Sequence, residues 1–276
     1  MTKKILALGV AASLALASGL AVAELREGYV YLDSPTADHP LDEIISGYEF
    51  RDDATRALQA DDFENPGFLL LEQGQDLWST VDGSEGKSCE TCHGDVTESM
   101  AGVGSTYPKI MMQGGERKLT NIENQINTCR TERMGAEAWK YDKAPLQAMT
   151  ILVKNVDRGE PVNVTIDGEY EPWFKQGEEL YYTRVGQLDM SCAHCHEAHY
   201  GQFIRADHLS QGQTNGFPTY RFKWSGQGSL HRRFSGCIKN IRGEPYSKGG
   251  DEFLALELYT AWRGQGLPIE TPSVRN

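Results

Sequence analysis

Two five-residue motifs constrain this chain more than any other feature of its sequence. They are Cys89-Glu90-Thr91-Cys92-His93 and Cys192-Ala193-His194-Cys195-His196, and both read C-x-x-C-H. This pattern is typical of c-type haem attachment, in which the two thiols bond to the haem and the histidine binds its iron. A zinc site built from the four thiols would leave the two trailing histidines unexplained. The sequence therefore predicts two covalently bound haem c groups.

The N-terminus, residues 1–23, is predicted to be a signal peptide. Two lysines precede a continuous apolar segment that ends in the small-residue cleavage site Ala21-Val22-Ala23. An uncleaved anchor helix is the alternative, but the sequence turns polar at Glu24 and favours cleavage. No second long apolar stretch follows, so we expect an exported protein with no membrane span after the signal is removed.

The chain is acidic, and this excludes one class of partner. Its net charge is −12, and loss of Lys3 and Lys4 with the signal peptide takes the charge to −14. A surface of that sign repels phosphate backbones, so we expect no nucleic-acid partner.

An internal similarity predicts the domain organisation. Gln73-Gly74-Gln75-Asp76-Leu77-Trp78 resembles Gln176-Gly177-Glu178-Glu179-Leu180-Tyr181 at an offset of 103 residues, which is also the offset from Cys89 to Cys192. We interpret the shared pattern as a helix-packing motif. The expected fold is mainly α, with two tandem cytochrome c-like domains related by internal duplication. Their predicted bounds are 24–163, including an acidic N-terminal arm, and 164–276.

Each predicted copy has one helix before its haem motif and another at its end. Asn65 is expected to cap the first helix with Pro66 at its first position, and Pro172 to open the equivalent helix. Apolar spacing predicts the closing helices over about 145–158 and 251–263. Between the copies, alternation over 162–166 predicts a short strand.

Two cysteines remain after haem attachment, Cys129 and Cys237. Cys129 lies 40 residues after Cys89, and Cys237 lies 45 residues after Cys192. A small cytochrome c usually supplies its second iron ligand from this part of its chain. We interpret both as thiolate ligands, each facing its own haem. A disulfide between them is the alternative.

The methionines favour the thiolate interpretation more strongly in the second copy. No methionine follows Met190 there, which leaves Cys237, a histidine (His199, His208 or His231) or a weak ligand such as lysine as the second ligand. In the first copy several methionines remain available, so Cys129 rests mainly on symmetry; these are Met100, Met111, Met112, Met134 and Met149.

A basic stretch surrounds Cys237 in this acidic chain. Residues 208–243 contain no Asp or Glu but six Lys and Arg side chains: Arg221, Lys223, Arg232, Arg233, Lys239 and Arg242. Such a field attracts anionic substrates, so we predict an anion site there. Arg233 would lie one helical turn from Cys237, and Arg232 and Lys239 are the next candidates. A solvated basic face, or pairing with haem propionates, is the alternative.

These motifs together resemble the SoxA family, the larger subunits of the SoxAX cytochromes of thiosulfate oxidation. The most specific segments are Asn127-Thr128-Cys129-Arg130, His231-Arg232-Arg233-Phe234-Ser235-Gly236-Cys237 and Arg242-Gly243-Glu244-Pro245. Both haem motifs are intact, so the resemblance implies the dihaem type. It implies a periplasmic heterodimer with a monohaem SoxX subunit that oxidatively couples thiosulfate to a cysteine thiol of the carrier SoxYZ. Two electrons would pass through haem to a c-type cytochrome, which makes the protein an L-cysteine S-thiosulfotransferase.

The resemblance also implies residue roles. His93 and Cys129 would bind the first iron, and His196 and Cys237 the second. Cys237 would be the persulfide-bearing catalytic ligand, and Arg233 an active-site arginine at the cofactor.

Three other functions stay open at this stage. A pure electron carrier would use the basic stretch only to dock a redox partner. A thiosulfate dehydrogenase would join two thiosulfates without a carrier protein, but such enzymes are expected to offer Met or Lys at their other haem. A dihaem peroxidase would need a vacant or displaceable iron site.

Overall fold

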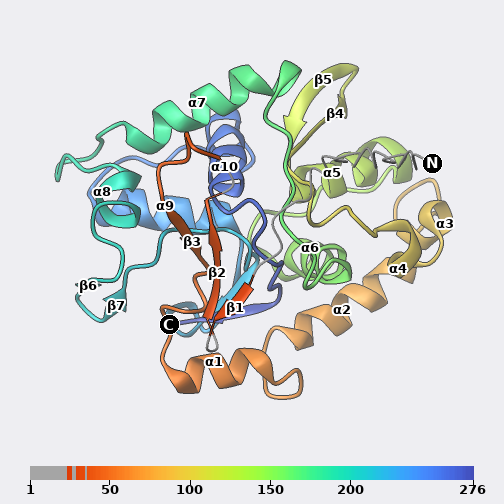
Figure 1. Ribbon diagram of the computed structural model, residues 1–276. Coiled ribbons are helices and arrows are strands. Elements are labelled where there is room, and N and C mark those ends of the chain that lie inside the picture. The colour runs from red at the N-terminus through yellow and green to blue at the C-terminus, as the bar shows by residue number, and fades with distance from the viewer. Residues whose placement is uncertain (1–23, 27–28, 35) are drawn as a thin grey trace, which may run out of the picture.

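The computed structural model describes residues 24–26, 29–34 and 36–276, so the predicted signal peptide lies outside the described residues. Helices dominate this part of the chain (Figure 1). The α-helices are α1 (Asp53–Ala60), α2 (Phe68–Ser79), α3 (Cys89–His93), α4 (Val96–Ser99), α5 (Ile122–Cys129), α6 (Ala144–Val156), α7 (Glu171–Tyr182), α8 (Cys192–His196), α9 (Leu230–Asn240) and α10 (Asp251–Arg263).

Short strands form four small sheets around the helices. β1 (Glu24–Arg26), β2 (Tyr29–Asp33) and β3 (Glu43–Ile45) make an antiparallel sheet near the N-terminal end. β10 (Ser273–Arg275) pairs parallel with β8 (Thr219–Arg221), which pairs antiparallel with β9 (Gly226–Gly228). The two hairpins are β4 (Lys109–Gln113) with β5 (Glu116–Thr120), and β6 (Phe203–Ile204) with β7 (Asp207–His208).

Two tightly crossed helix pairs form the core. α2 packs against α6, and α7 packs against α10 (Figure 1). A Cβ on Gly74 would lie 2.5 Å from the Ala148 carbonyl oxygen, and a Cβ on Gly177 would collide with the Ala255 carbonyl oxygen. Only glycine permits these approaches, because any side chain would push the helices apart. The structure confirms that the repeated Gln-Gly-x-x-Leu-aromatic pattern is a packing motif.

Most predicted helix bounds are confirmed, with one correction. α6 and α10 coincide with the predicted closing helices to within two residues, and Pro172 lies in the first turn of α7. The predicted cap at Asn65 is wrong, because α2 begins at Phe68. The Asn65 amide instead donates to the Pro272 carbonyl at 2.9 Å, which ties this loop to the C-terminal segment.

The predicted strand over 162–166 is also wrong. Val162 and Val164 are buried with their side chains in the core, as the alternation indicates. Their backbone is extended, with Val162 N–H donating to the Leu267 carbonyl at 2.8 Å and Gly266 N–H donating to the Val162 carbonyl at 2.8 Å. The opposing segment 264–269 is irregular, so these bonds do not continue as a ladder.

The acidic arm packs on the C-terminal half of the chain. Leu32 and Ile44 share a buried cluster with Leu267, and α1 contacts β10 beside the C-terminus (Figure 1). The Gln59 side-chain oxygen accepts a hydrogen bond from Val274 N–H at 3.0 Å.

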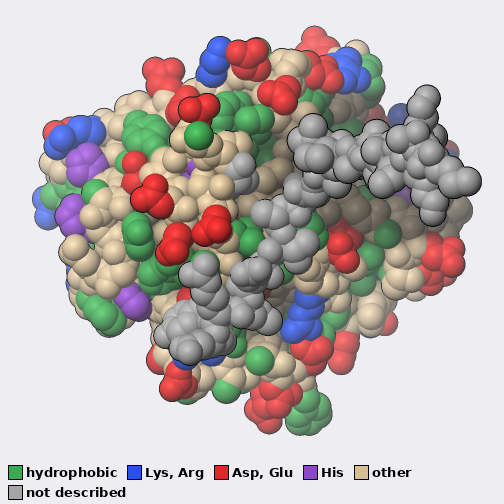
Figure 2. Space-filling model, viewed as in Figure 1, with side chains coloured by type: hydrophobic (Ala, Val, Ile, Leu, Met, Phe, Trp, Pro, Cys, Tyr) green, Lys and Arg blue, Asp and Glu red, His purple; other side chains and the backbone are tan. Residues whose placement is uncertain are grey.

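The exposed face in Figure 2 carries many Asp and Glu side chains among fewer Lys and Arg, as the composition predicts. Within the described ranges, every helix is too short or too polar to cross a membrane.

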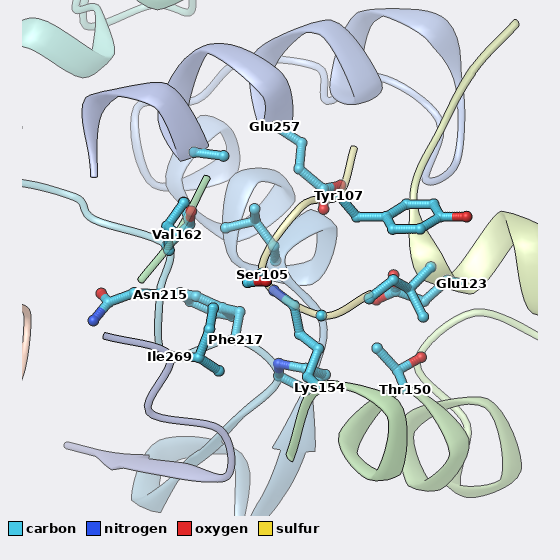
Figure 3. A pocket seen from close by; sticks show the side chains of 16 residues that line it. Ser105, Tyr107, Glu123, Thr150, Lys154, Val162, Asn215, Phe217, Glu257 and Ile269 are labelled. Atoms are coloured by element: carbon cyan, nitrogen blue, oxygen red, sulfur yellow. The ribbon is translucent and has the colours of Figure 1, made fainter. Parts of the chain in front are cut away.

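A small cavity of about 20 Å³ lies between α5, α6 and α10, at the junction of the two helix pairs. Glu123, Lys154 and Glu257 point into it from these three helices (Figure 3). Its size is sufficient for about one water molecule, which the charged walls would hold. This polar cluster lies in the interior and is distinct from the cysteine and histidine sites described next.

Candidate haem and anion site

The first C-x-x-C-H motif forms the single helical turn α3. The Ser88 hydroxyl accepts from Thr91 N–H, and the Thr91 hydroxyl accepts from Ser88 N–H, which closes a capping box around the motif. Trp78 of α2 donates its indole N–H to the Gly94 carbonyl at 2.9 Å, and its ring lies 5.8 Å from that of His93. His93 itself is exposed, so its imidazole is available to a ligand.

The second motif forms α8 and positions its histidine more firmly. His196 Nδ1 lies 2.8 Å from the Ser210 carbonyl oxygen. Because a carbonyl only accepts, Nδ1 carries the proton and Nε2 presents its lone pair, which is the tautomer that an iron ligand needs. Gly212, with φ of +79°, packs against the same ring, and a Cβ there would lie 2.9 Å from His196 Cγ.

Cys237 of α9 faces His196, as the predicted ligand pair requires. The Ser229 hydroxyl caps α9 by accepting from Arg232 N–H at 3.1 Å. Burial alone would raise the pKa of the Cys237 thiol, but the positive charge of Arg233 and the adjacent His196 side chain outweigh it. Together with Arg221 they lower the pKa to about 7. Cys237 is therefore readily available as a thiolate, the form that binds metals and attacks sulfur.

Cys129 lies at the end of α5, where the chain continues into a π-helical turn over 130–134. Gln125 donates its side-chain N–H to Cys129 Sγ at 3.5 Å. Burial raises the pKa of this thiol, and the Gln125 bond and Arg133 offset only part of the rise. The two remaining cysteines thus occupy comparable places but differ in acidity.

All six cysteines lie in the described part of the chain and all are free thiols, so the disulfide alternative between Cys129 and Cys237 is not what the structure contains. The thiols of Cys89 and Cys92 stand one helical turn apart on α3, and those of Cys192 and Cys195 do so on α8. These positions, with the lone pair of His196 opposite Cys237, fit a covalently attached haem.

The basic groups near Cys237 are partly those predicted. Arg233 lies one turn before Cys237 on α9 and makes no hydrogen bond or ion pair with another described residue, so its guanidinium is free. Arg232 is turned away: it donates to the Gln227 carbonyl at 3.1 Å and stacks on Trp224. Lys239 is exposed. Arg232 is therefore engaged elsewhere, whereas a role for Lys239 stays a prediction.

Two further arginines join the site from outside α9. Arg221 of β8 is among the charges that lower the pKa of Cys237. The pKa of Arg51, from the acidic arm, is lowered by burial first and then by repulsion from Arg275, Arg221 and Arg233. From the sequence, Arg221 was predicted only as one of the six basic residues of the stretch 208–243. No local sequence pattern indicates a role for Arg51. One carboxylate faces these arginines: Asp207, one residue before the stretch, pairs with Lys223 at 2.6 Å.

The paired helices, the haem-attachment turns and the histidine opposite a thiolate define a c-type cytochrome. Residues 73–162 match the family model described as SoxA/TsdA, cytochrome c domain. The chain is 52% identical to the L-cysteine S-thiosulfotransferase subunit SoxA of Pseudaminobacter salicylatoxidans, over 86% of this chain and 82% of the relative. The corresponding subunit of Rhodovulum sulfidophilum is 50% identical, over 88% and 85%.

A solved structure agrees. The fold matches the crystal structure of SoxXA from P. pantotrophus with a TM-score of 0.82 and 48% identity, covering 86% of this chain and 89% of that chain. The chain belongs to the SoxA family.

Proposed function

We propose that this protein is the haem-bearing subunit of a periplasmic L-cysteine S-thiosulfotransferase. It couples thiosulfate to a cysteine thiol of a SoxYZ-type carrier. An S–S bond forms between the outer sulfur of thiosulfate and the thiol sulfur, the thiol releases its proton, and two electrons pass to haem and on to a c-type cytochrome. The observation that carries the proposal is the half-buried Cys237 thiol, whose pKa is lowered to about 7 by Arg233, His196 and Arg221 against the effect of burial.

The chain's own residues suit this chemistry. The Cys237 thiolate bonds to the outer sulfur of thiosulfate, which divides the reaction into two steps. The carrier thiolate then attacks that sulfur and displaces Cys237, as in thiol–disulfide exchange. Arg233, which has no described partner, neutralises the anionic substrate. Bound haem would accept the two electrons released in the first step.

The proposal includes two haems held by two copies of one domain. Gly74 and Gly177 make equivalent contacts, each with the carbonyl of an alanine on the closing helix, and both C-x-x-C-H motifs form short capped helices. His93 with Cys129 would ligate the first iron, and His196 with Cys237 the second. The domains would span 24–163 and 164–276.

The proposed partner is a SoxX-type monohaem subunit. A SoxXA complex is the solved structure that this fold matches over 86% of the chain. The predicted signal peptide and the c-type haem motifs support a periplasmic location, since such motifs belong to exported cytochromes.

A second candidate is a tetrathionate-forming thiosulfate dehydrogenase. The matching family model describes SoxA and TsdA cytochrome c domains together, and this observation favours the dehydrogenase as the second candidate. Against it, Cys129 occupies the place where such enzymes are expected to offer Met or Lys.

The mass of the Cys237 peptide tests the proposal. Holoprotein is isolated without reductant, treated with thiosulfate or buffer, and digested. We expect a sulfur or thiosulfonate adduct on Cys237 after thiosulfate. Cys129 serves as the internal control and is expected to stay unmodified, because its thiol is less acidic.

Product analysis separates the two candidates. Transfer of the thiosulfonate group to a SoxYZ-type carrier supports the proposed function, whereas tetrathionate formed without any carrier supports the dehydrogenase. An unmodified Cys237 under both conditions would leave an electron carrier and would end the transferase proposal.

A further inference from the structure

Arg221 differs from the other basic residues near Cys237 in how firmly it is held. It is 7% exposed and lies at the end of β8, a strand paired on both sides. Its guanidinium stacks on Trp224 at 5.0 Å, and Arg232 stacks on the same ring at 4.5 Å. Two arginines thus share one indole, and Arg221 is also among the charges that lower the pKa of Cys237, after Arg233 and His196.

The hydrogen bonds of Arg221 leave one side of its guanidinium available. Its Nε donates to the Asn276 carbonyl at 2.9 Å, and its Nη2 lies 3.6 Å from Asp207, too far for a good hydrogen bond. Nη1 has no acceptor among the described residues and is not among the side-chain atoms sealed from solvent. A fixed guanidinium with a free edge is suited to bind an oxyanion.

The surrounding charges leave an excess of positive charge. Arg51, Arg221, Arg233 and Arg275 interact with one another, and the carboxylates nearest them are Asp207 and Glu270. Burial and mutual repulsion lower the pKa of Arg51 and of Arg221 to about 10, so both stay charged at neutral pH. Crowded like charges raise the free energy of the empty site, and a bound dianion relieves that repulsion.

The packing also shows which arginines are already satisfied. Arg275 donates to Glu270 at 2.7 Å, and Arg51 donates to the His208 carbonyl at 2.7 Å. Arg233 and the Nη1 edge of Arg221 are left without acceptors among the described residues. Arg233 lies one turn before Cys237 on α9. The segment 207–210 connects Arg221 with the second haem site, because its Asp207 lies 3.6 Å from Arg221 and its Ser210 carbonyl lies 2.8 Å from His196 Nδ1.

We propose that Arg221 is a second anion-binding residue of the site and binds the sulfonate oxygens of thiosulfate together with Arg233. This inference rests on the proposed function. Trp224 and the Asn276 carbonyl hold the guanidinium in place, so that its free edge meets the substrate while the outer sulfur reaches Cys237.

Matched substitutions on the two faces of Trp224 test the proposal. Thiosulfate binding to the oxidised holoprotein is measured by calorimetry for wild type, Arg221→Gln, Arg221→Lys and Arg232→Gln. Loss of a charged hydrogen bond weakens binding by about tenfold or more. We expect that loss for Arg221→Gln, partial recovery for Arg221→Lys and wild-type affinity for Arg232→Gln. In turnover, Arg221→Gln is expected to raise KM more than it lowers kcat.

Two results would overturn the assignment. Unchanged thiosulfate affinity in Arg221→Gln would remove Arg221 from the binding site. A changed haem absorption spectrum and midpoint potential, with affinity no weaker than in Arg232→Gln, would make Arg221 a haem propionate partner instead. Failure of the proposed function is separate: wild type would then bind thiosulfate but form no adduct on Cys237 or the carrier.

Discussion

His231 Nε2 and Glu257 Oε2 lie 2.9 Å apart in the interior of the protein, where α9 meets α10. The Gly249 N–H donates to His231 Nδ1 at 2.9 Å. The Gly249 carbonyl accepts from Asn124 of α5 at 2.9 Å. The helix that carries Cys237 and the helix that carries Cys129 are thereby joined through the backbone of Gly249, which is half-buried.

Glu123 of α5 faces this pair and should make stability depend on pH. Burial, and then the charge of Glu257, raise the pKa of Glu123 from 4.5 to about 7, although His231 and Lys154 oppose the rise. The folded protein then binds a proton that the unfolded chain releases between pH 4.5 and 7, so unfolding free energy falls as pH rises through this range.

We therefore expect Glu123→Gln to be more stable than wild type at pH 8, by about 2 kcal/mol, with a smaller difference at pH 5. Thermal unfolding of both holoproteins across this range measures the difference. A difference in melting temperature that stays constant from pH 5 to pH 8 would contradict the prediction. The exposed Glu72→Gln on α2 controls for the loss of one negative charge.

The close helix contacts at Gly74 and Gly177 should not tolerate any side chain at these two positions. Gly74→Ala or Gly177→Ala places a methyl group against a backbone carbonyl that cannot move independently of its helix. We expect each to lower unfolding free energy by about 2 kcal/mol or more, as overpacking does. Leu69→Ala on the exposed face of α2 is the control, since Leu69 is 70% exposed. Equal melting temperatures for Gly74→Ala and Leu69→Ala would show that the helices do not need this close approach.

Gly212 should matter to the His196 ligand in particular. Gly212→Ala adds a Cβ that collides with the imidazole and strains a backbone with φ of +79°. Gly201, with φ of +80° and no atom within 4 Å of a Cβ, would suffer the same backbone strain without the collision. We expect Gly212→Ala, and not Gly201→Ala, to change the low-spin electron paramagnetic resonance signal of the His196 haem. Identical spectra for both variants would mean that the ring accommodates the methyl group.

Arg263 holds α10 to the segment beside the second motif. It is 1% exposed, contacts Glu197 at 3.1 Å through Nη1 and stacks over Tyr181 at 4.4 Å. Arg263→Met leaves the half-buried carboxylate of Glu197 with the Tyr182 hydroxyl as its remaining partner. Breaking a pair of which only one member is fully buried is expected to cost about 2 kcal/mol. The exposed pair Arg117–Glu169 is the comparison, and Arg117→Met is expected to change denaturant midpoints within experimental error. Equal midpoints for both variants would show that Arg263 stabilises little.

Local patterns were enough to predict the haem motifs and the closing helices. C-x-x-C-H is contiguous, so its chemistry is complete within five residues, and the spacing of apolar residues in α6 and α10 reflects one buried face. The two errors, at Asn65 and at 162–166, have a common cause. In both places the C-terminal segment supplies the backbone partner, and sequence neighbours cannot reveal a partner about 100 residues or more away.

By itself, the sequence determined the glycine motif by which two helix pairs pack, and it predicted where haem attaches and that Cys129 and Cys237 correspond, because each depends on residues close together along the chain. Only the tertiary structure decided how the two cysteines differ. Arg233, Arg221 and His196 come from α9, β8 and α8, and their side chains lower the pKa of Cys237, whereas burial dominates at Cys129. Acidity is set by what surrounds a thiol in space, and folding alone brings those groups together.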